Sequence, residues 1–271
     1  MNEKKKNQIL LSNDDGIDSP GLWAAAEALS ELGFVTVTAP RDHMSATGRG
    51  FQKNSDGIIT RRTVTVHGQK WDVYAIGGSP SQSVTHGILE VAPERPDLVV
   101  SGINFGENMA SDVSYSGTVG AAMEGASLGI PGLAMSQEIN FEEWDRYHES
   151  IDFSTAAYFT KFFAKIILEN GLPEGVDVLN VVVPEGATPD TPWKVTPFAD
   201  IRYFRPYVVR EGRPDEPGRI RSRRPSVDGL EPGNDVYTVR VERKVSVTPL
   251  SINLTARVDL DDFDSLLRSR I

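Results

Sequence analysis

Residues 9–22 read Ile-Leu-Leu-Ser-Asn-Asp-Asp-Gly-Ile-Asp-Ser-Pro-Gly-Leu, and this stretch decides the fold class. The apolar run at its start predicts a short buried strand. Ser19-Pro20 supplies a helix cap and a proline at the first helical position, so a helix is expected to follow. Between them lie the carboxylates of Asp14 and Asp15, whose mutual repulsion is costly at an apolar strand end. A divalent cation would remove that cost, but a solvated Asp-Gly turn explains the same residues equally well.

Strand and helix patterns alternate along the first half of the chain, which is typical of a parallel sheet flanked by helices. Strands are expected at 34–39, within 58–76, and at 98–100, 133–135 and 178–183. Helices are expected at 22–32, after Ser79-Pro80, from about residue 118, and at 153–168 and 261–268. The sequence therefore predicts an α/β fold.

Composition excludes several classes of protein. The chain has 271 residues, with 39% hydrophobic and 24% charged residues, as in a globular protein with one large domain or a domain with an extension. It has no cysteine, so disulfides and thiolate zinc sites are excluded. The net charge of −10 argues against a nucleic-acid polymer as partner. Its apolar runs are too short for a membrane helix or a signal peptide, so we expect a cytoplasmic protein without membrane contact.

Three of the predicted strands end in polar sequence. The first ends at Asp14 and Asp15, the second leads into a loop that contains Ser45, and the strand at 98–100 leads to Asn104. Ligands of doubly wound sheets gather at the carboxyl ends of the strands. Two carboxylates, a hydroxyl and an amide oxygen are an all-oxygen set that suits Mg²⁺ or Mn²⁺.

A candidate anion site opens the predicted helix near residue 118. Ser116, Gly117 and Thr118 stand at its start, where free N–H groups and the positive end of the helix dipole attract phosphate. An ordinary Ser/Thr cap explains these residues as well, and taken alone is the simpler interpretation. The small residues that follow favour close contact between helix and sheet.

Taken together, these segments resemble the SurE family, the survival protein E family of metal-dependent nucleoside monophosphate phosphatases. The matching segments lie in order at 10–16 with 20–21, 39–40 and 45–48, 96–104, 112–122, 124–125 with 129–131, and 245–250. The resemblance covers most of residues 8–137 and a patch at 234–255. It implies a Rossmann-like three-layer sandwich with a mostly parallel sheet, and a β-rich C-terminal extension used in oligomerisation.

The resemblance also implies the site and its partners. It implies a nucleoside monophosphate substrate, one divalent metal per subunit (Mg²⁺ or Mn²⁺), and a homodimer or homotetramer. By position, the metal ligands would be Asp14, Asp15, Ser45 and Asn104, and the two aspartates would be the catalytic residues. The substrate phosphate would be contacted by Asn13, Asn108, Ser116, Gly117 and Thr118.

The expected organisation has three parts. Residues 1–140 would form the metal- and phosphate-binding core, 141–200 the remaining helix and strands of that core, and 201–271 an arm, a hairpin and a C-terminal tail with subunit contacts. The stretch 205–233 is rich in Arg, Pro and Gly and has no clear period, so it predicts a long arm or loop. Segments 237–241 and 245–247 predict the hairpin. Residues 200–233 match no family segment, which leaves base preference and assembly open.

The expected reaction is hydrolysis by a metal-bound water. A carboxylate that holds a metal is a poor base, so this route ranks above general-base catalysis by Asp14 or Asp15, and an aspartyl-phosphate intermediate ranks last. His43 is either a solvated loop residue or a proton shuttle, and His67, His86 and His148 have no assigned role.

Two other classes of function remain as alternatives. An exopolyphosphatase or a broad-specificity phosphomonoesterase would use the same site. A non-catalytic nucleotide-binding Rossmann protein would keep only the fold, since fold alone does not decide function. A dinucleotide-binding oxidoreductase is disfavoured, because the first strand–helix turn lacks the glycine pattern and places acids where the pyrophosphate would lie.

Overall fold

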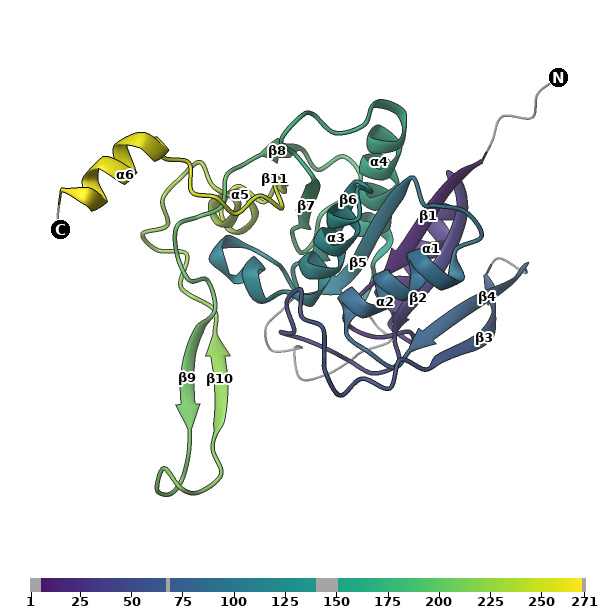
Figure 1. Ribbon diagram of the computed structural model, residues 1–271, viewed down its shortest axis with the longest axis horizontal. Helices are drawn as coiled ribbons and strands as arrows, with labels where there is room; N and C mark the ends of the chain where they lie inside the picture. The colour runs from purple at the N-terminus through teal and green to yellow at the C-terminus, as the bar shows by residue number, and fades with distance from the viewer. Residues whose placement is uncertain (1–5, 67–68, 140–150, 270–271) are drawn as a thin grey trace.

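The computed structural model of the protein describes residues 6–66, 69–139 and 151–269. A nine-stranded, mostly parallel sheet runs through this part of the chain in the order β3-β4-β2-β1-β5-β6-β7-β11-β8 (Figure 1). Its strands are β1 (Asn7–Ser12), β2 (Gly33–Pro40), β3 (Ile59–Val66), β4 (Gln69–Ile76), β5 (Leu98–Phe105), β6 (Gly132–Gln137), β7 (Val178–Val183), β8 (Trp193–Val195) and β11 (Val245–Leu250). The antiparallel pairs are β3 with β4 and β11 with β7. The predicted α/β fold is confirmed.

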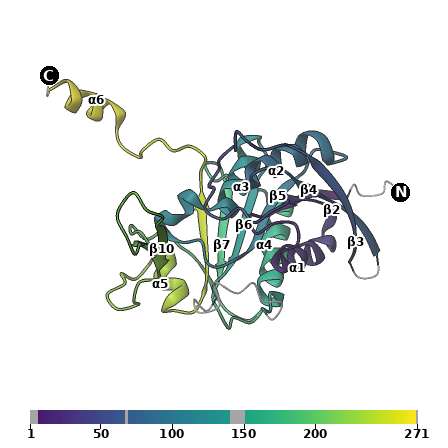
Figure 2. The same ribbon diagram turned by 90° about the horizontal axis from the view of Figure 1, so that it is seen from below.

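Helices cover both faces of the sheet (Figure 2). One face carries α1 (Pro20–Ser30) and α4 (Ser154–Asn170), and the other carries α2 (Pro80–His86), its π-helical continuation (Gly87–Val91) and α3 (Gly117–Ser127). Strand β1 shows why its sequence is apolar throughout. Ile9 and Leu11 pack into the cluster that contains α1 and α4, whereas Leu10 packs with Val84 and Ala121 on the opposite face.

The central strands bring the predicted site residues to one edge. Strand β1 pairs in parallel with β2 and with β5, so all three end on the same side of the sheet. The acidic turn follows β1, the loop with Ser45 follows β2, and Asn104 lies near the end of β5. A 3₁₀ turn (Ala110–Tyr115) then leads into the N-terminus of α3 at the same edge.

The C-terminal part differs in detail from the prediction. Within 205–233 the chain forms an antiparallel hairpin of β9 (Arg205–Val209) and β10 (Arg219–Arg223), which projects from the body (Figure 1). The predicted hairpin of 237–241 with 245–247 is wrong. The first segment belongs to the helix α5 (Asp235–Arg240), and the second belongs to β11 in the main sheet.

The physical reason for α5 is its cap, because the β-branched residues inside it favour a strand. The Asn234 side chain accepts the Tyr237 N–H at 3.0 Å. Asp235 accepts the N–H groups of Ala110, Ala199 and Val236 at 2.6–2.8 Å. The contacts with Ala110 and Ala199 come from distant segments, so local propensity does not reveal them.

The chain ends in α6 (Leu260–Arg268), which confirms the predicted terminal helix. His67 and His148, to which no role is assigned, lie outside the described residues. The division of the chain at residues 140 and 200 stays a prediction. Among the described residues, no helix combines the length and apolar character that crossing a membrane requires.

Candidate active site

Asn13 builds the turn that presents the two aspartates. Its Oδ1 accepts the Gly16 N–H at 3.2 Å, and its Nδ2 donates to the Gly16 carbonyl at 3.0 Å. Gly16 has a φ of +97°, which a residue with a Cβ rarely adopts. The Asn13 side chain is fully buried and does not line the cavity beside the turn. The structure therefore gives Asn13 a role in shaping the turn, and its predicted contact with phosphate stays a prediction.

Asp14 and Asp15 are buried side by side, with 4% and 7% of their surface exposed. Thr118 Oγ1 donates to Asp14 Oδ1 at 2.5 Å, and the Phe105 N–H donates to Asp15 Oδ2 at 3.1 Å. Burial, and then repulsion by Asp15, raise the pKa of Asp14 from 3.8 to about 7, against the effect of the Thr118 hydrogen bond. Ionising both carboxyl groups therefore carries a cost near neutral pH, which a bound cation would offset.

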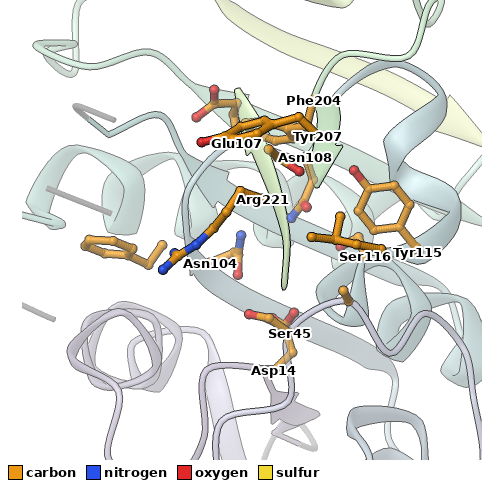
Figure 3. Close-up of a pocket in the computed structure, with 14 residues that line it drawn as sticks. Asp14, Ser45, Asn104, Glu107, Asn108, Tyr115, Ser116, Phe204, Tyr207 and Arg221 are labelled. Carbon is orange, nitrogen blue, oxygen red and sulfur yellow. The ribbon is translucent and has the colours of Figure 1, made fainter. Parts of the chain in front are cut away.

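Ser45 and Asn104 add neutral oxygens to this pair. The Ser45 loop is anchored by the Met44 N–H, which donates to the Asp14 carbonyl at 2.7 Å. Asn104 Nδ2 donates to the Gly106 carbonyl at 2.7 Å, which fixes the orientation of the amide and its oxygen. Both side chains line the cavity with Asp14 (Figure 3).

This donor set fits a hard divalent cation. No cluster of three or more His, Asp or Glu side chains suited to a metal occurs in the described parts of the chain. The candidate centre depends instead on two carboxylates supplemented by hydroxyl and amide oxygens, and Mg²⁺ typically takes one or two carboxylates besides water and phosphate.

His43 lies at the rim of this oxygen set. Its Nε2 contacts Ser45 Oγ and lies 3.9 Å from Asp15 Oδ1, and its side chain is nearly half exposed. The side chain is thus partly solvated and within reach of the site, and its role as a proton shuttle stays a prediction.

The N-terminus of α3 lies directly against Asp14. Ser116 caps the helix by accepting the Val119 N–H at 3.1 Å and also lines the cavity. A Cβ at Gly117 would lie 2.7 Å from the Asp14 Cβ, so only glycine permits this approach. Thr118 is buried behind Asp14. The helix N-terminus and the carboxyl pair are therefore parts of one site.

Asn108 supplies a donor with no partner inside the described protein. Its N–H donates to Ser136 Oγ and its carbonyl accepts from Asn180, which fix its backbone. Its Nδ2 is buried and has no hydrogen-bond partner among the described residues, and the residue lines the cavity. A buried donor left unpaired is costly, and an anion in the cavity would satisfy it.

The cavity has a volume of about 470 Å³ and a second wall that sequence reasoning missed. Aromatic and arm residues form this wall: Tyr115, Phe204, Tyr207, Ile220, Arg221 and Ser222 (Figure 3). Most of them come from 204–222, about 100 residues beyond the metal and phosphate segments. That stretch contains arginines and aromatic residues, which are the signal from which sequence reasoning could have found this wall. They show no periodic pattern that would have linked the stretch to the site.

In comparisons with known proteins, the matching family model, relatives and solved structure all carry the name SurE. The family model "Survival protein SurE" matches residues 9–205. A protein of Thermococcus gammatolerans named 5'-nucleotidase SurE is 45% identical over 265 residues, covering 96% of each chain. One of the same name from Methanocella arvoryzae is 40% identical over 271 residues, covering 96% of this chain and 98% of the relative. The solved structure of the SurE protein from Aquifex aeolicus aligns with a TM-score of 0.74 at 31% identity, covering 97% of this chain and 100% of that one.

Proposed function

This chain belongs to the SurE family, and from that premise we propose that it is a metal-dependent 5'-nucleotidase. It hydrolyses nucleoside monophosphates to nucleoside and phosphate with one divalent metal, Mg²⁺ or Mn²⁺, per subunit. The relatives at 35–45% identity over nearly the whole chain carry the name of this enzyme class.

One observation supports the metal above all others. Asp14 and Asp15 are buried side by side, Asp14 lines a cavity with Ser45 and Asn104, and the pKa of Asp14 is raised to about 7. In the absence of a cation, ionisation of this buried pair would destabilise the fold near neutral pH. Asp14, Asp15, Ser45 and Asn104 would hold the ion.

The chain's own residues then position and stabilise the phosphoryl group. A bound divalent ion supplies polarisation of phosphorus and a lowered pKa of the attacking water. Ser116 and the N–H groups at the start of α3 face the developing negative charge, and Asn108 Nδ2 donates a hydrogen bond to a phosphate oxygen. Asp14 and Asp15 orient the reacting groups, since carboxylates that hold a cation are poor bases. The cavity of about 470 Å³ has the size of a small-molecule site.

A matrix of metals and substrates tests the proposal. We expect phosphate release from AMP and GMP that disappears with EDTA and returns with Mg²⁺ or Mn²⁺. Asp14→Asn and Asp15→Asn should each lower kcat/KM at least a hundredfold, whereas Asp18→Asn, a control on the same loop with an 80% exposed side chain, should change it less than twofold. Activity within threefold of wild type in either site variant would refute the assignment.

The same matrix separates the alternatives. Release from polyphosphate or p-nitrophenyl phosphate without release from AMP would favour the exopolyphosphatase or the general phosphomonoesterase. Binding of AMP without any release in the presence of metal would favour a non-catalytic nucleotide-binding protein.

We also propose a homodimer or homotetramer of cytoplasmic location. The arm and α6 carry exposed apolar residues, among them Val208 and Leu267, which suits subunit contacts. Light scattering tests the assembly: Val208→Lys or Leu267→Lys should lower the particle mass, and Leu89→Lys, at an exposed position on the body, should not. A single-chain mass for the wild type would contradict the proposal.

A further inference from the structure

Both roots of the hairpin meet at one buried carboxylate. The arm that carries the hairpin consists of residues 203–224. Tyr203 lies two residues before β9, and Arg224 directly follows β10. Tyr203 Oη donates to Glu107 Oε1 at 2.9 Å. Arg224 Nη2 donates to Glu107 Oε2 at 2.8 Å and lies 2.7 Å from Oε1. Glu107 is only 2% exposed and belongs to the loop between Asn104 and Asn108. The active-site loop is therefore tied directly to the arm.

The contacts of Glu107 indicate that it holds neighbouring side chains in place and does not serve as a proton donor. Both of its oxygens are engaged, and Arg224 donates further to the Ile139 carbonyl at 2.9 Å. Arg240 donates to Tyr203 Oη at 2.5 Å and pairs with Glu138 at 3.2 Å, so the network continues into α5 and the end of β6. A buried ion pair that loses one partner leaves an uncompensated charge, which is strongly unfavourable.

The two roots are held by different kinds of contact. On the β9 side, Phe204 packs with Met109, Val236 and other apolar residues, and its N–H donates to Asp112 at 2.5 Å. On the β10 side, Arg224 Nη2 donates to Glu107 and to the Ile139 carbonyl. All residues of β9 and β10 are exposed. The Glu107–Arg224 pair therefore contributes to the position of β10, whose own residues are exposed.

Strand β10 places a positively charged side chain at the cavity. Arg221 lies three residues before Arg224 and lines the same cavity as Asp14 and Asn104 (Figure 3). Of the described residues that line this cavity, Arg221 is the one with a formal positive charge. Tyr207 on β9 lines it as well. A guanidinium matches the geometry of phosphate oxygens, and an aromatic ring offers a stacking surface for a nucleobase.

We propose that Glu107 is a positioning residue that, through Arg224, holds β10 so that Arg221 contacts the substrate phosphate and Tyr207 borders the nucleoside. The inference rests on the proposed function for the identity of the substrate, a nucleoside phosphomonoester. Arg221 is the residue that touches substrate. Glu107 also lines the cavity, but its two carboxylate oxygens accept hydrogen bonds from Tyr203 and Arg224, so it acts on substrate through the arm.

Steady-state kinetics with AMP tests whether Glu107 acts on substrate binding through Arg221. Arg221→Gln removes a charge-assisted hydrogen bond and should raise KM about tenfold or more while kcat changes less than threefold. Glu107→Gln should raise KM in the same way. The double variant should exceed Arg221→Gln by less than threefold, because both substitutions remove the same contact. Arg221→Lys, which keeps the charge, should recover part of the affinity.

A matched control lies on the same strand. Arg219 is two residues from Arg221, on the same side of β10, and does not line the cavity, so Arg219→Gln should leave KM within twofold of wild type. Since Arg221 is exposed on the arm, its replacement does not threaten folding, and it tests the proposal even if Glu107→Gln is unstable.

Three results would overturn the proposal. They are an unchanged KM in Arg221→Gln, an additive effect of the two substitutions, and a loss confined to kcat in Glu107→Gln. A wild-type protein that releases no phosphate from AMP would instead refute the proposed function. The arm would then be tested by calorimetric binding of AMP, which Arg221→Gln should weaken about tenfold and Arg219→Gln should not.

Discussion

We expect Asp14→Asn to stabilise the metal-free protein at pH 8 and to abolish its stabilisation by metal. The reason is the pKa of Asp14, which burial and repulsion by Asp15 raise from 3.8 to about 7. The folded protein therefore holds this proton more tightly than the unfolded chain does. The metal-free fold loses stability as the pH rises from about 4 to about 7, and the loss is complete above that range.

The structure sets the size of the effect. At about 1.4 kcal/mol for each pH unit, the rise of the pKa corresponds to an upper bound of about 4 kcal/mol above pH 7. Asparagine keeps the shape of the side chain and an oxygen for the Thr118 hydroxyl, so most of this gain should be realised. A gain of about 2–4 kcal/mol in a chain of this length raises Tm by about 5–10 °C.

Thermal melts in EDTA measure this gain in stability of the metal-free variant. The variant should melt above wild type at pH 8, and the difference should shrink to less than half at pH 5, where the wild-type carboxyl is largely protonated. Added Mn²⁺ should raise the Tm of wild type and leave that of the variant unchanged. Asp18→Asn, at an exposed position in the same segment, is the control and should move Tm by less than about 2 °C. A metal-free Asp14→Asn protein less stable than wild type at pH 8 would refute the reasoning.

Two further predictions concern the same centre. Gly117→Ala should lower kcat/KM at least tenfold, because its Cβ would lie 2.7 Å from the Asp14 Cβ and displace either the carboxylate or the start of α3. Steady-state kinetics on AMP checks this result, and an activity within twofold of wild type would contradict the tight approach. Metal affinity should rise about tenfold per pH unit below about 7 and level off above it, because a proton must leave Asp14 before the cation binds. Mn²⁺ titrations between pH 5.5 and 8 check this slope, and a flat profile would exclude Asp14 as a ligand that titrates in this range.

The parts of the fold that could be predicted are those whose sequence signals are local. The strand–turn–helix at residues 9–30 has an apolar run, a polar turn and a Ser-Pro pair within a few residues. The structure forms the strand and the helix with Pro20 at its start, although the Ser19 side chain makes no capping hydrogen bond. The grouping of Asp14, Ser45 and Asn104 followed from a general property of parallel sheets, whose strand ends lie at one edge. The order of the strands then determined which loops meet.

The parts that could not be predicted depend on contacts between distant segments. Strands β9 and β10 are exposed on both faces, so no face required the alternating pattern that identifies a strand. Helix α5 is short and rich in β-branched residues, and it is held by the Asn234 cap and by the contacts of Asp235 with Ala110 and Ala199. Arg221 and Tyr207 reach the cavity through the hairpin, and no local sequence pattern indicates which part of the protein the hairpin contacts.

The measurement that tests the central claim most directly is calorimetric titration of Mn²⁺ into the wild type and into Asp14→Asn and Asp15→Asn at pH 7.5. It reads binding independently of catalysis, and Asp18→Asn serves as the matched control. We expect one Mn²⁺ per chain in wild type and in the control, and a loss of affinity of at least a hundredfold in both site variants. Undiminished binding in either site variant would contradict the claim that these two buried carboxylates hold the metal.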